Sequence, residues 1–413
     1  MKIAVLASSY PPMVSGAALF AEKLAVEMAK RSHEVLVLAT SDRSYPYRVT
    51  GPRLIVERFR SYRIPLPIFQ RMVVWPHRLI MTRLDEFAPD VIHIHDPFQF
   101  GLSGLLYGRR QRVPVVFTIH QLPWFVSAYL PNSLYLHKTL EDVLWRYACW
   151  FLGQCALVAV PTQTIAEVVH AHTCILPEVI SYGVDLDTFQ PFALDPGEED
   201  IVRARLGVPN GFPIILYIGR LDLDKHVERV VRAAAQAMKQ VQAQLVVVGD
   251  GTQRKKLIQL CRTLNIFERS HFPGFISNKD GLPAIYRASS LFVTASEIET
   301  QGIVLLEATA CGLPIVAVRA TCVHEIVHTG DNGLLAAPGD INELASNITW
   351  LLQHPDQARI MGQAGRKIVE SHPLGAALNA YEVLYEKVAQ FAQLPATTAS
   401  TSAAVPGLPK GSE

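Results

Sequence analysis

Short apolar runs alternate with longer segments of helical periodicity along the first half of the chain. A strand of a parallel sheet reads as a nearly continuous apolar run, because helices cover both of its faces. The intervening segments repeat their apolar residues with the period of an amphipathic helix. The pattern predicts an α/β fold with parallel strands at 3–7, 34–39, 91–95, 115–120 and 157–160 and helices at 18–31 and 164–170.

The alternation breaks after residue 180 and restarts at Ile214, which indicates two domains. Proline, glycine and acidic residues dominate the interruption, as is typical of a connection between domains. A chain of 413 residues is also too long for a single core. We expect an N-terminal domain at 1–185, a linker at 186–211, a C-terminal domain at 212–375, a last helix at about 376–391 that packs back on the first domain, and a disordered tail at 394–413.

The stretch from Glu299 to Gly312 carries the strongest candidate chemistry. Residues 303–311 are apolar on nearly every side, which predicts a buried helix, and Glu307 is the only charged residue inside it. A helix N-terminus behind the turn at Gly302 offers N–H groups to a phosphate, and a buried carboxylate needs donors such as sugar hydroxyls. Glu299 and Glu307 beside such an anion site suit a nucleotide sugar. The alternative is that Glu307 pairs with a core arginine and Glu299 is a solvated loop residue.

Two cations and several glycines follow the strands of the second domain. Ligands of parallel sheets bind at the carboxyl ends of the strands, and Arg220 and Lys225 follow the strand that begins at Ile214. A planar guanidinium and a compact ammonium together suit a diphosphate. Gly249 and Gly274 follow further predicted strands and leave a wall that a base or a ribose can approach.

The strand ends of the first domain supply candidates for the facing side of a site. Gly16 follows the first strand, where it either allows a close approach to a ligand or serves as a plain turn. His93 and His95 share one face of a strand without a third metal ligand nearby in sequence, so a cleft-lining role is preferred over a metal site. His120 is either a sugar-binding or catalytic residue or a satisfied core histidine. The aromatic run at 122–130 is a candidate for an apolar acceptor pocket.

The net charge of +1 argues against a general nucleic-acid binder, but the charge is unevenly distributed. From Arg43 to Arg83 there are nine arginines and one acid, Glu57, among large apolar side chains. This composition suits an anionic membrane surface, or else a solvated basic face. No apolar run is long enough to span a bilayer, and the first one is too short for a signal peptide. The six cysteines form no metal motif and are expected to be reduced core thiols, so we predict a cytoplasmic protein with at most peripheral membrane contact.

These residues, taken together, resemble the retaining family 4 glycosyltransferases, whose GT-B fold places two Rossmann-like α/β/α domains face to face across a cleft. The similarity extends from the N-terminus to about residue 391. Its motifs, in chain order, are Ser9-Tyr10-Pro11-Pro12 with Gly16; His33-Glu34-Val35; Pro89-Asp90-Val91-Ile92-His93; Gly183-Val184-Asp185 with Phe189 and Pro191; Gly219-Arg220-Leu221 with Lys225; Gly249-Asp250-Gly251; and Glu299-x7-Glu307.

The resemblance assigns roles position by position. Arg220 and Lys225 match the pair that holds the donor diphosphate. Glu307 matches the acid that binds the ribose hydroxyls, and Glu299 matches the acid near the 3-hydroxyl of the sugar. The other matches are Gly16, a loop glycine close to donor and acceptor; His120, near the transferred sugar; and the N–H groups of Gly302, Ile303 and Val304, which form the phosphate-binding turn.

Two positions depart from the pattern of the family. Ser15 stands where the first of two loop glycines is usual, which puts the fine geometry of that loop in doubt. Residues 320–322 stand where a glycine-rich turn often precedes the acid at Glu325, so that wall of the site is also expected to differ.

The resemblance implies transfer of a hexose from a UDP or GDP sugar to a hydroxyl, with retention of configuration and without a required metal or cofactor. The family includes enzymes of membrane lipids, and the wording at 299–302 is similar to some glycolipid synthases. A lipid acceptor such as diacylglycerol or phosphatidylinositol is therefore the leading expectation. A soluble or polysaccharide acceptor, a nucleotide-sugar epimerase of the same architecture and a two-lobed sugar-binding protein remain as alternatives. A sugar phosphorylase is disfavoured, because no lysine presents itself for a covalently bound cofactor.

Overall fold

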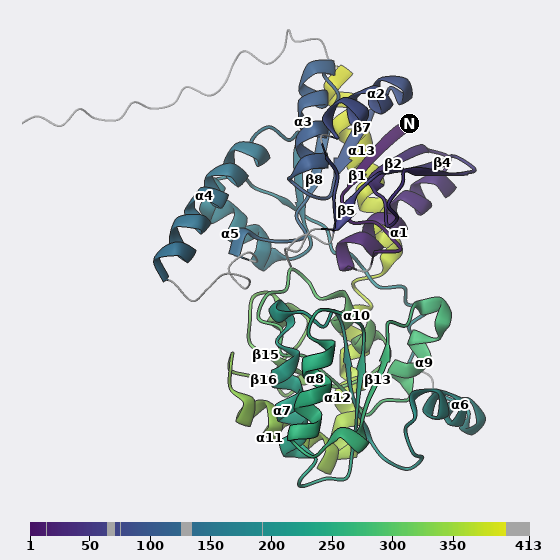
Figure 1. Cartoon of the computed structure of the whole chain (residues 1–413), viewed down its shortest axis with the longest axis vertical. Helices are drawn as coiled ribbons and strands as arrows, with labels where there is room; N and C mark the ends of the chain where they lie inside the picture. Colours follow the sequence, from purple (N-terminus) through teal and green to yellow (C-terminus); the bar gives the residue numbers. More distant parts are fainter. Residues whose placement is uncertain (14, 64–70, 75, 125–133, 192, 394–413) are drawn as a thin grey trace, which may run out of the picture.

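The computed structural model describes residues 1–13, 15–63, 71–74, 76–124, 134–191 and 193–393. The chain forms two α/β domains that are stacked along the long axis of the molecule (Figure 1). The predicted tail at 394–413, positions 64–70 and 75 of the basic stretch, and positions 125–130 of the aromatic run lie outside the described residues.

The N-terminal domain is built on an eight-stranded, mainly parallel sheet. Its strands are β1 (Lys2–Ala7), β2 (Glu34–Thr40), β3 (Tyr47–Gly51), β4 (Leu54–Phe59), β7 (Val91–Ile94), β8 (Val115–Thr118), β9 (Leu157–Val160) and β10 (Glu178–Val179), in the order β10-β9-β8-β7-β1-β2-β4-β3. The predicted parallel strands are confirmed, but β3 pairs antiparallel with β4 at one edge. The apolar pattern did not indicate this hairpin, because β3 is largely exposed and carries polar residues. A separate antiparallel pair consists of β5 (Tyr62–Arg63) and β6 (Arg71–Met72).

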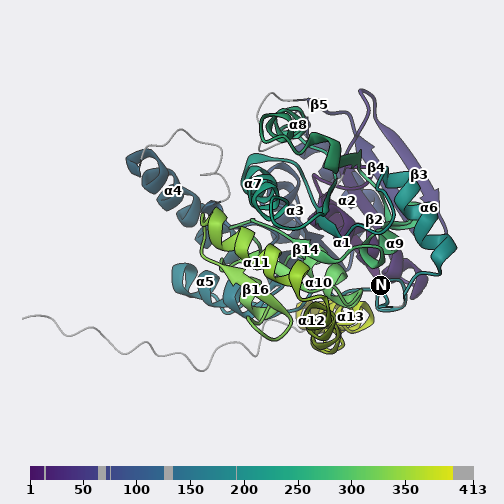
Figure 2. The ribbon, with the colours of Figure 1, turned by 90° about the horizontal axis from the view of Figure 1, so that it is seen from below.

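Helices cover both faces of this sheet, as the continuous apolar strands require. Alternate residues of β1 point to opposite sides: Ile3 packs with the core under the first helix, whereas Leu6 packs with the core on the other side. The helices are α1 (Gly16–Lys30), α2 (His77–Phe87), α3 (Gln99–Gln111), α4 (Leu134–Leu152) and α5 (Gln163–Thr173). Helix α4 extends sideways from the body of the domain in two perpendicular views (Figures 1 and 2).

The C-terminal domain repeats this plan with a six-stranded parallel sheet. Its strands are β11 (Ile214–Ile218), β12 (Gln244–Val248), β13 (Ser270–Gly274), β14 (Leu291–Val293), β15 (Ile315–Val318) and β16 (Gly333–Ala336), in the order β13-β12-β11-β14-β15-β16. The covering helices are α6 (Pro196–Leu206), α7 (Val227–Ala237), α8 (Arg254–Thr263), α9 (Leu282–Arg287), α10 (Ile303–Ala310), α11 (Ile341–Gln353) and α12 (Pro355–Val369).

In each sheet the strand order reverses at one strand, where the chain connections switch from one side of that strand to the other. These two strands indicate where a ligand binds. In the N-terminal sheet β1 lies between β2 and β7, and in the C-terminal sheet β11 lies between β12 and β14. A ligand of an open α/β sheet binds outside the carboxyl end of such a switch strand. A ligand is therefore expected beside the segments that follow β1 and β11.

The last helix, α13 (Leu374–Gln393), returns to the N-terminal domain. The chain crosses over at His372, whose carbonyl accepts from the N–H of Val184 at 2.9 Å. Tyr381 and Tyr385 of α13 are fully buried in the core beneath α1. Helix α13 lies among the helices of the N-terminal domain in Figure 1, where it is drawn in yellow.

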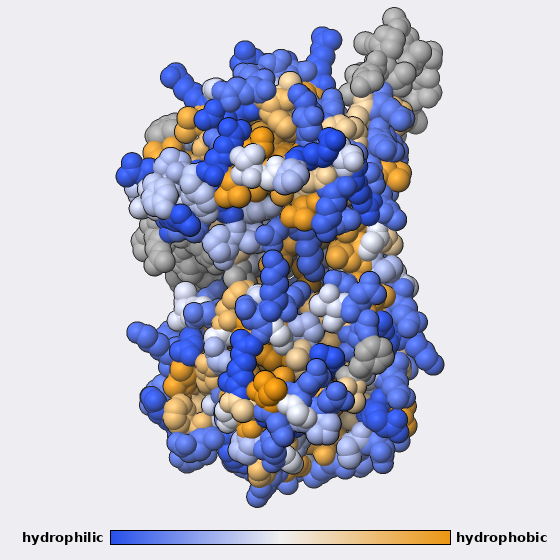
Figure 3. Space-filling view, turned by 90° about the vertical axis from the view of Figure 1, so that its right-hand side faces the viewer, coloured by the Kyte–Doolittle hydropathy of each residue, from blue (hydrophilic) through white to orange (hydrophobic). Residues whose placement is uncertain are grey.

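The face of the molecule shown in Figure 3 is mainly hydrophilic, with small apolar patches on both domains. None of the described helices is long and apolar enough to cross a membrane. The expectation that all six cysteines are core thiols was wrong for two of them. Cys149 of α4 and Cys174, which follows α5, are exposed.

Candidate functional site

Arg220 and Lys225 follow β11, the switch strand of the C-terminal sheet. The two terminal nitrogens of the Arg220 guanidinium bond carboxylate oxygens of Asp222 and Asp224, each at 2.6 Å. Lys225 Nζ donates to Glu299 Oε1 at 2.5 Å. The structure therefore brings the two cations and the first predicted acid into one cluster, although Lys225 and Glu299 are separated by 74 positions.

Glycine is required at Gly249 and at Gly274 for different structural reasons. Gly249 has a φ of 136°, and a Cβ there would collide with the carbonyl oxygen of Gly219. Gly249 thus lets the ends of β11 and β12 approach, and its N–H donates to the Gly274 carbonyl at 2.9 Å. Gly274 has a φ of +87°, and a Cβ there would meet no described atom within 4 Å. Gly274 borders open space beside the strand ends, where a ligand can approach the backbone.

Helix α10 begins at Gly302, which has the left-handed φ of 78° that favours glycine. The N–H groups of Leu305 and Leu306 bond the Gly302 carbonyl at 2.9 and 3.3 Å and close the first turn. The N–H groups of Ile303 and Val304 lie in that turn, where a helix has no internal acceptor for them and its dipole is positive. This geometry suits an anion.

Glu307 is a buried carboxylate on α10, only 6% exposed. The hydroxyl of Tyr286 donates to Glu307 Oε2 at 2.9 Å, so no core arginine is needed to hold it. Burial raises the pKa of Glu307 to about 7, and the ammonium of Lys23 on α1 opposes this rise. Lys23 belongs to the facing domain, so the carboxylate feels a charge across the domain boundary.

The loop after β1 meets the start of α10 from the opposite domain. A Cβ on Gly16 would lie 3.4 Å from Ile303 Cδ1, which places Gly16 against the first turn of α10. Ser15, which stands where the family usually has the first of two loop glycines, caps α1, because its Oγ accepts from the N–H of Ala18 at 3.1 Å. The Ser15 Oγ also lies 3.3 Å from Ser9 Oγ. The serine thus has a structural role that the family pattern did not indicate.

His120 follows β8 and lies in a row of hydrogen-bonded rings. Its Nε2 is 2.8 Å from Nδ1 of His95, and its Nδ1 is 2.7 Å from the hydroxyl oxygen of Tyr182. Burial lowers the pKa of His120 to about 3, and burial together with the neighbouring histidines lowers the pKa of His95 well below its usual range. His120 is therefore a neutral imidazole at physiological pH, and both of its ring nitrogens have partners.

His93 lies deeper and contacts the returning helix. Its Nδ1 is 2.6 Å from the Tyr385 hydroxyl, and its Nε2 is 2.8 Å from Thr118 Oγ1. The Tyr381 hydroxyl lies 2.9 Å from the same threonine oxygen. His93 serves to attach α13 to the sheet. Sequence reasoning missed both tyrosines, because they come from α13 and no local pattern joins them to β7.

The loop before α10 also contacts the N-terminal domain directly. Thr300 Oγ1 donates to the His120 carbonyl at 3.2 Å, and Thr162 Oγ1 donates to the Thr300 carbonyl at 2.8 Å. The Gln301 side chain is 1% exposed. Its Oε1 accepts from the N–H of Tyr182 at 2.7 Å, and its Nε2 donates to Ser181 Oγ at 2.6 Å. The loop at residues 299–302 therefore contacts both domains.

Glu325 makes a second bridge between the domains. Its two carboxylate oxygens accept from the N–H groups of Gln163 and Thr164 at 3.1 and 2.7 Å. These N–H groups open α5, so a carboxylate from one domain caps a helix of the other. Sequence reasoning had connected Glu325 only with a wall of the site.

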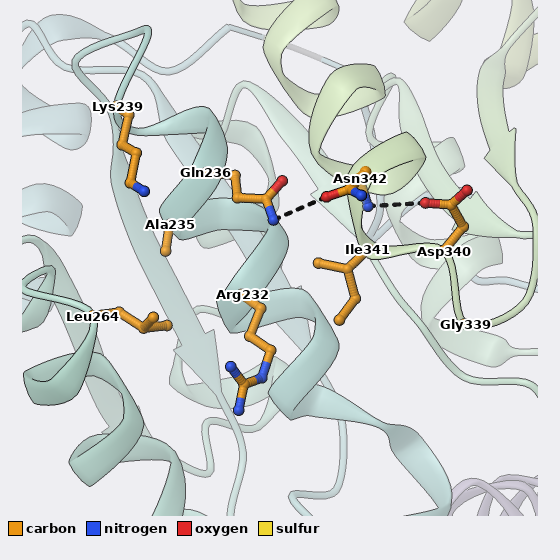
Figure 4. A pocket seen from close by; sticks show the side chains of 9 residues that line it. All are labelled: Arg232, Ala235, Gln236, Lys239, Leu264, Gly339, Asp340, Ile341 and Asn342. Atoms are coloured by element: carbon orange, nitrogen blue, oxygen red, sulfur yellow. Dashed lines mark hydrogen bonds between the residues drawn. The ribbon is translucent and has the colours of Figure 1, made fainter.

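A separate pocket of about 690 Å³ lies away from these residues, between α7 and the start of α11. Arg232 and Gln236 of α7 and Lys239 just after this helix line it, and Gln236 Nε2 donates to Asn342 Oδ1 at 3.2 Å (Figure 4). None of the predicted site residues belongs to it. Its size is therefore no argument for function.

The residues at the domain boundary make a chemically consistent set. Two cations and a helix N-terminus supply positive charge for a diphosphate, and two carboxylates supply acceptors for hydroxyl groups. The N-terminal domain contributes Gly16, whose backbone lies close to the first turn of α10, and the neutral imidazole of His120. The arrangement can bind a ligand that carries both phosphates and hydroxyls and can stabilise negative charge on a departing phosphate.

Two family models match successive parts of the chain. Residues 14–188 match the model described as Glycosyltransferase Family 4, and residues 198–368 match the model described as Glycosyl transferases group 1. Together the two models cover most of the sequence.

Known proteins of similar sequence and structure agree with these matches. The alpha-monoglucosyldiacylglycerol synthase of Streptococcus pneumoniae is 26% identical over 77% of this chain and 71% of its own length. A GDP-mannose-dependent alpha-mannosyltransferase of Mycobacterium tuberculosis is 28% identical over 86% of this chain and 89% of its own length. The structure of HepE of Anabaena in complex with UDP-glucose has a TM-score of 0.75 and 23% identity, and the match covers 94% of this chain and 100% of that chain. The likeness of structure confirms the predicted fold of two facing Rossmann-like domains.

Proposed function

Because the chain belongs to the family 4 glycosyltransferases and is a hexosyltransferase, we propose that it moves a hexose from a UDP or GDP sugar to a hydroxyl of a membrane lipid, with retention of configuration. The observation that carries the donor half of this proposal is the convergence of Arg220, Lys225, Glu299 and the first turn of α10 at the end of β11. The acceptor half is carried by the surface of the N-terminal domain described below.

The donor binds with its diphosphate between the two cations and α10. Lys225 and Arg220 contact phosphate oxygens, and the N–H groups of Ile303 and Val304 complete the anion site. Glu307 accepts from the ribose hydroxyls, and Glu299 accepts from a hydroxyl of the transferred sugar. Gly16 faces the same turn of α10, so the donor lies between the two domains.

The reaction is a displacement at the anomeric carbon on the face that the phosphate leaves. The acceptor oxygen bonds the anomeric carbon, the bond from that carbon to the phosphate oxygen breaks, and the departing phosphate takes the acceptor proton. Lys225, Arg220 and the α10 dipole stabilise the charge that develops on the diphosphate. Glu299 and Glu307 serve hydroxyl groups, so we assign no covalent intermediate to either, and the assignment requires no metal or cofactor.

His120 acts in this scheme as a neutral hydrogen-bonding group. A histidine whose pKa is lowered to about 3 by burial carries no proton to give at neutral pH. His120 therefore contributes position and polarity near the sugar, and proton transfer is left to the donor phosphate.

The acceptor side rests on the stretch from Arg43 to Arg83. Arg58 is buried and donates to the carbonyl oxygens of Tyr10, Pro11 and Thr40, so it is a structural residue of the loop after β1. Five other arginines of this stretch remain exposed beside exposed large apolar side chains. The arginines are Arg43, Arg48, Arg53, Arg60 and Arg78, and the apolar residues are Tyr45, Val49, Tyr62, Met72, Val74 and Leu79.

Exposed cations mixed with tyrosine and aliphatic side chains suit the headgroup region of an anionic membrane. A lipid acceptor such as diacylglycerol or phosphatidylinositol is presented at that surface. The name of the similar synthase from Streptococcus pneumoniae supports an acceptor of this kind. We accordingly place the protein in the cytoplasm, bound peripherally to the inner face of the membrane.

The test is nucleotide release from a panel of UDP and GDP sugars. Each donor is incubated with anionic vesicles that contain diacylglycerol or phosphatidylinositol, with the same vesicles lacking the acceptor, and with soluble sugars. Release that requires the acceptor lipid is the expected result, and the anomeric configuration of the isolated glycolipid checks retention.

Each alternative gives a different outcome. Release with soluble sugars or polysaccharides alone refutes the lipid acceptor, and conversion of the donor without any acceptor points to an epimerase. Binding of a sugar without turnover of any donor points to a two-lobed binding protein. A product with inverted anomeric configuration refutes the proposed displacement, in which the acceptor attacks the face of the anomeric carbon that the phosphate leaves.

A further inference from the structure

The loop at residues 299–302 is hydrogen-bonded to both domains, and different side chains contact each domain. Glu299 bonds Lys225 in the C-terminal domain at 2.5 Å. Thr300 and Gln301 bond the N-terminal domain, at the His120 carbonyl and at the segment Ser181–Tyr182. The loop that carries the acid for the sugar is therefore fastened to the residues around His120.

Gln301 uses its whole amide for this contact. The side chain is 1% exposed, and its oxygen and nitrogen have partners at 2.7 and 2.6 Å. A buried amide with both ends satisfied fixes the groups that it joins, because breaking either bond leaves a buried polar atom without a partner. Gln301 thus fixes the backbone of Tyr182.

Tyr182 transmits this position to His120. Its hydroxyl oxygen is 2.7 Å from His120 Nδ1, and the two rings stack with centroids 5.4 Å apart. Phe20 of α1 packs against both rings and limits their movement. The route from Gln301 to the imidazole passes through one backbone N–H and one hydroxyl.

His120 is held from its other sides as well. His95 Nδ1 bonds Nε2 of the ring at 2.8 Å, and Thr300 Oγ1 bonds the backbone carbonyl at 3.2 Å. Tyr182 joins the His120 ring to the donor loop, because its hydroxyl contacts the ring and its N–H is held by Gln301 Oε1. Gln301 is therefore a residue through which the loop can set the orientation of the ring.

We infer that Gln301 is a positioning residue for His120, acting through Tyr182, so that the donor loop and the imidazole of the facing domain are placed as one unit. This inference rests on the proposed function only for its effect on turnover. A displaced reacting or positioning group costs up to about a hundredfold in rate per ångström. Loss of the Gln301 bonds is therefore expected to lower kcat and to leave donor binding, which Lys225 and Glu307 provide, nearly unchanged.

The kinetic test is a double-mutant cycle of Gln301→Met and Tyr182→Phe. Methionine keeps the size of the side chain and removes both hydrogen bonds, and phenylalanine removes only the hydroxyl. Each variant is expected to lower kcat about tenfold with the Kd for the nucleotide sugar within about twofold, and the double variant is expected to be no slower than about the worse single variant. A double variant as slow as the product of the two single effects would overturn the inference.

Two further variants separate this coupling from a general loosening of the domain boundary. Gln301→Glu keeps an acceptor for the Tyr182 N–H and is expected to retain a kcat at least about threefold above that of Gln301→Met. Equal losses in these two variants would overturn the inference. Glu325→Gln weakens the other bridge between the domains, and its effect is expected to multiply with that of Tyr182→Phe.

NMR spectroscopy tests the coupling between Gln301 and the His120 ring without measuring turnover. In the full-length protein with ¹⁵N-labelled histidine rings, the His120 signals are assigned by their loss in His120→Gln. Gln301→Met and Tyr182→Phe are both expected to shift these signals, and Glu325→Gln is expected to leave them in place. Unmoved His120 signals in Gln301→Met refute the inference, whereas a wild type that turns over no nucleotide sugar refutes only the proposed function.

Discussion

Glu307 gives a prediction whose magnitude follows from the structure. Burial on α10 raises its pKa from an ordinary 4.5 to about 7. Between these two values the folded protein keeps the proton and the unfolded chain has released it. The unfolded chain then binds fewer protons, so the free energy of unfolding falls as the pH rises through this window. The carboxylate that serves the ribose therefore destabilises the domain at neutral and alkaline pH.

The size of this effect follows from about 1.4 kcal/mol per pKa unit. From pH 5 to pH 8, linkage over the two pKa values gives a loss of about 2.5 kcal/mol in the free energy of unfolding. For a domain of about 150–250 residues, each kcal/mol corresponds to about 2–4 °C in Tm. Glu307→Gln keeps the shape and the acceptor for Tyr286, and it removes the titration. Its Tm is expected to exceed that of the wild type by about 5–10 °C more at pH 8 than at pH 5.

Calorimetry of the two proteins at pH 5, 6, 7 and 8 measures this difference. Glu268→Gln, which removes one exposed carboxylate, is the matched control and should follow the wild type. Parallel Tm curves for Glu307→Gln and the wild type would refute the reasoning, because they would mean that the buried carboxyl titrates alike in both states.

Donor binding supplies the complementary half of the same prediction. In the proposed function the ribose hydroxyls bond the ionised carboxylate of Glu307, so binding of the nucleotide sugar is expected to release a proton. Ionisation of a group with a pKa of about 7 tightens the affinity by about tenfold from pH 6 to pH 8. In Glu307→Gln this slope should vanish and the affinity should fall by about tenfold to a hundredfold, as expected for lost hydrogen bonds to a charged group. Titration calorimetry in two buffers of different ionisation enthalpy measures the proton release directly.

The other predictions concern the cations and the bridge between the domains. Lys225→Ala is expected to lower kcat by about a hundredfold to a thousandfold with the fold intact, whereas Lys239→Ala at the remote pocket keeps the wild-type rate; a near-normal rate in Lys225→Ala contradicts the phosphate assignment. Arg48→Gln and Arg60→Gln should each weaken binding to anionic vesicles by about 1 kcal/mol, measured by sedimentation, and unchanged binding removes the membrane assignment. Glu325→Ala removes the cap of α5 and should cost about 0.5–2 kcal/mol in thermal unfolding, and an unchanged Tm would show that the cap is not stabilising.

Much of the fold, and the grouping of the candidate residues Lys225 and Glu299, could be predicted from the sequence, and the reason is physical. Buried parallel strands need continuous apolar runs, and the residues after those runs lie at the carboxyl ends of the sheet. Arg220 and Glu307 could be singled out because Arg220 follows an apolar strand and Glu307 is the only charged residue inside an apolar helix.

The missed features depend on contacts between distant segments. The antiparallel β3 strand is largely exposed and so carries no apolar signal, and the cap that Glu325 gives to α5 joins positions separated by 161 residues. The burial of Arg58 follows from carbonyl oxygens that turn toward it in the loop after β1. No period or spacing encodes such contacts, because they are fixed by tertiary packing alone.

The pairing of Lys225 with Glu299 connects donor binding with recognition of the sugar. The Lys225 ammonium is stabilised by a carboxylate oxygen of Glu299 2.5 Å away, and in the proposed function the donor diphosphate competes with Glu299 for that ammonium. The exchange leaves Glu299 with a free oxygen at the moment when the sugar hydroxyls arrive, and a carboxylate in a cleft needs new donors. A donor with a hydroxyl in reach satisfies this need, whereas a nucleotide without its sugar leaves Glu299 unpaired. The Lys225–Glu299 ion pair stabilises two partly buried charges when no donor is bound. The same pair is therefore expected to favour binding of the nucleotide sugar over binding of the nucleotide product.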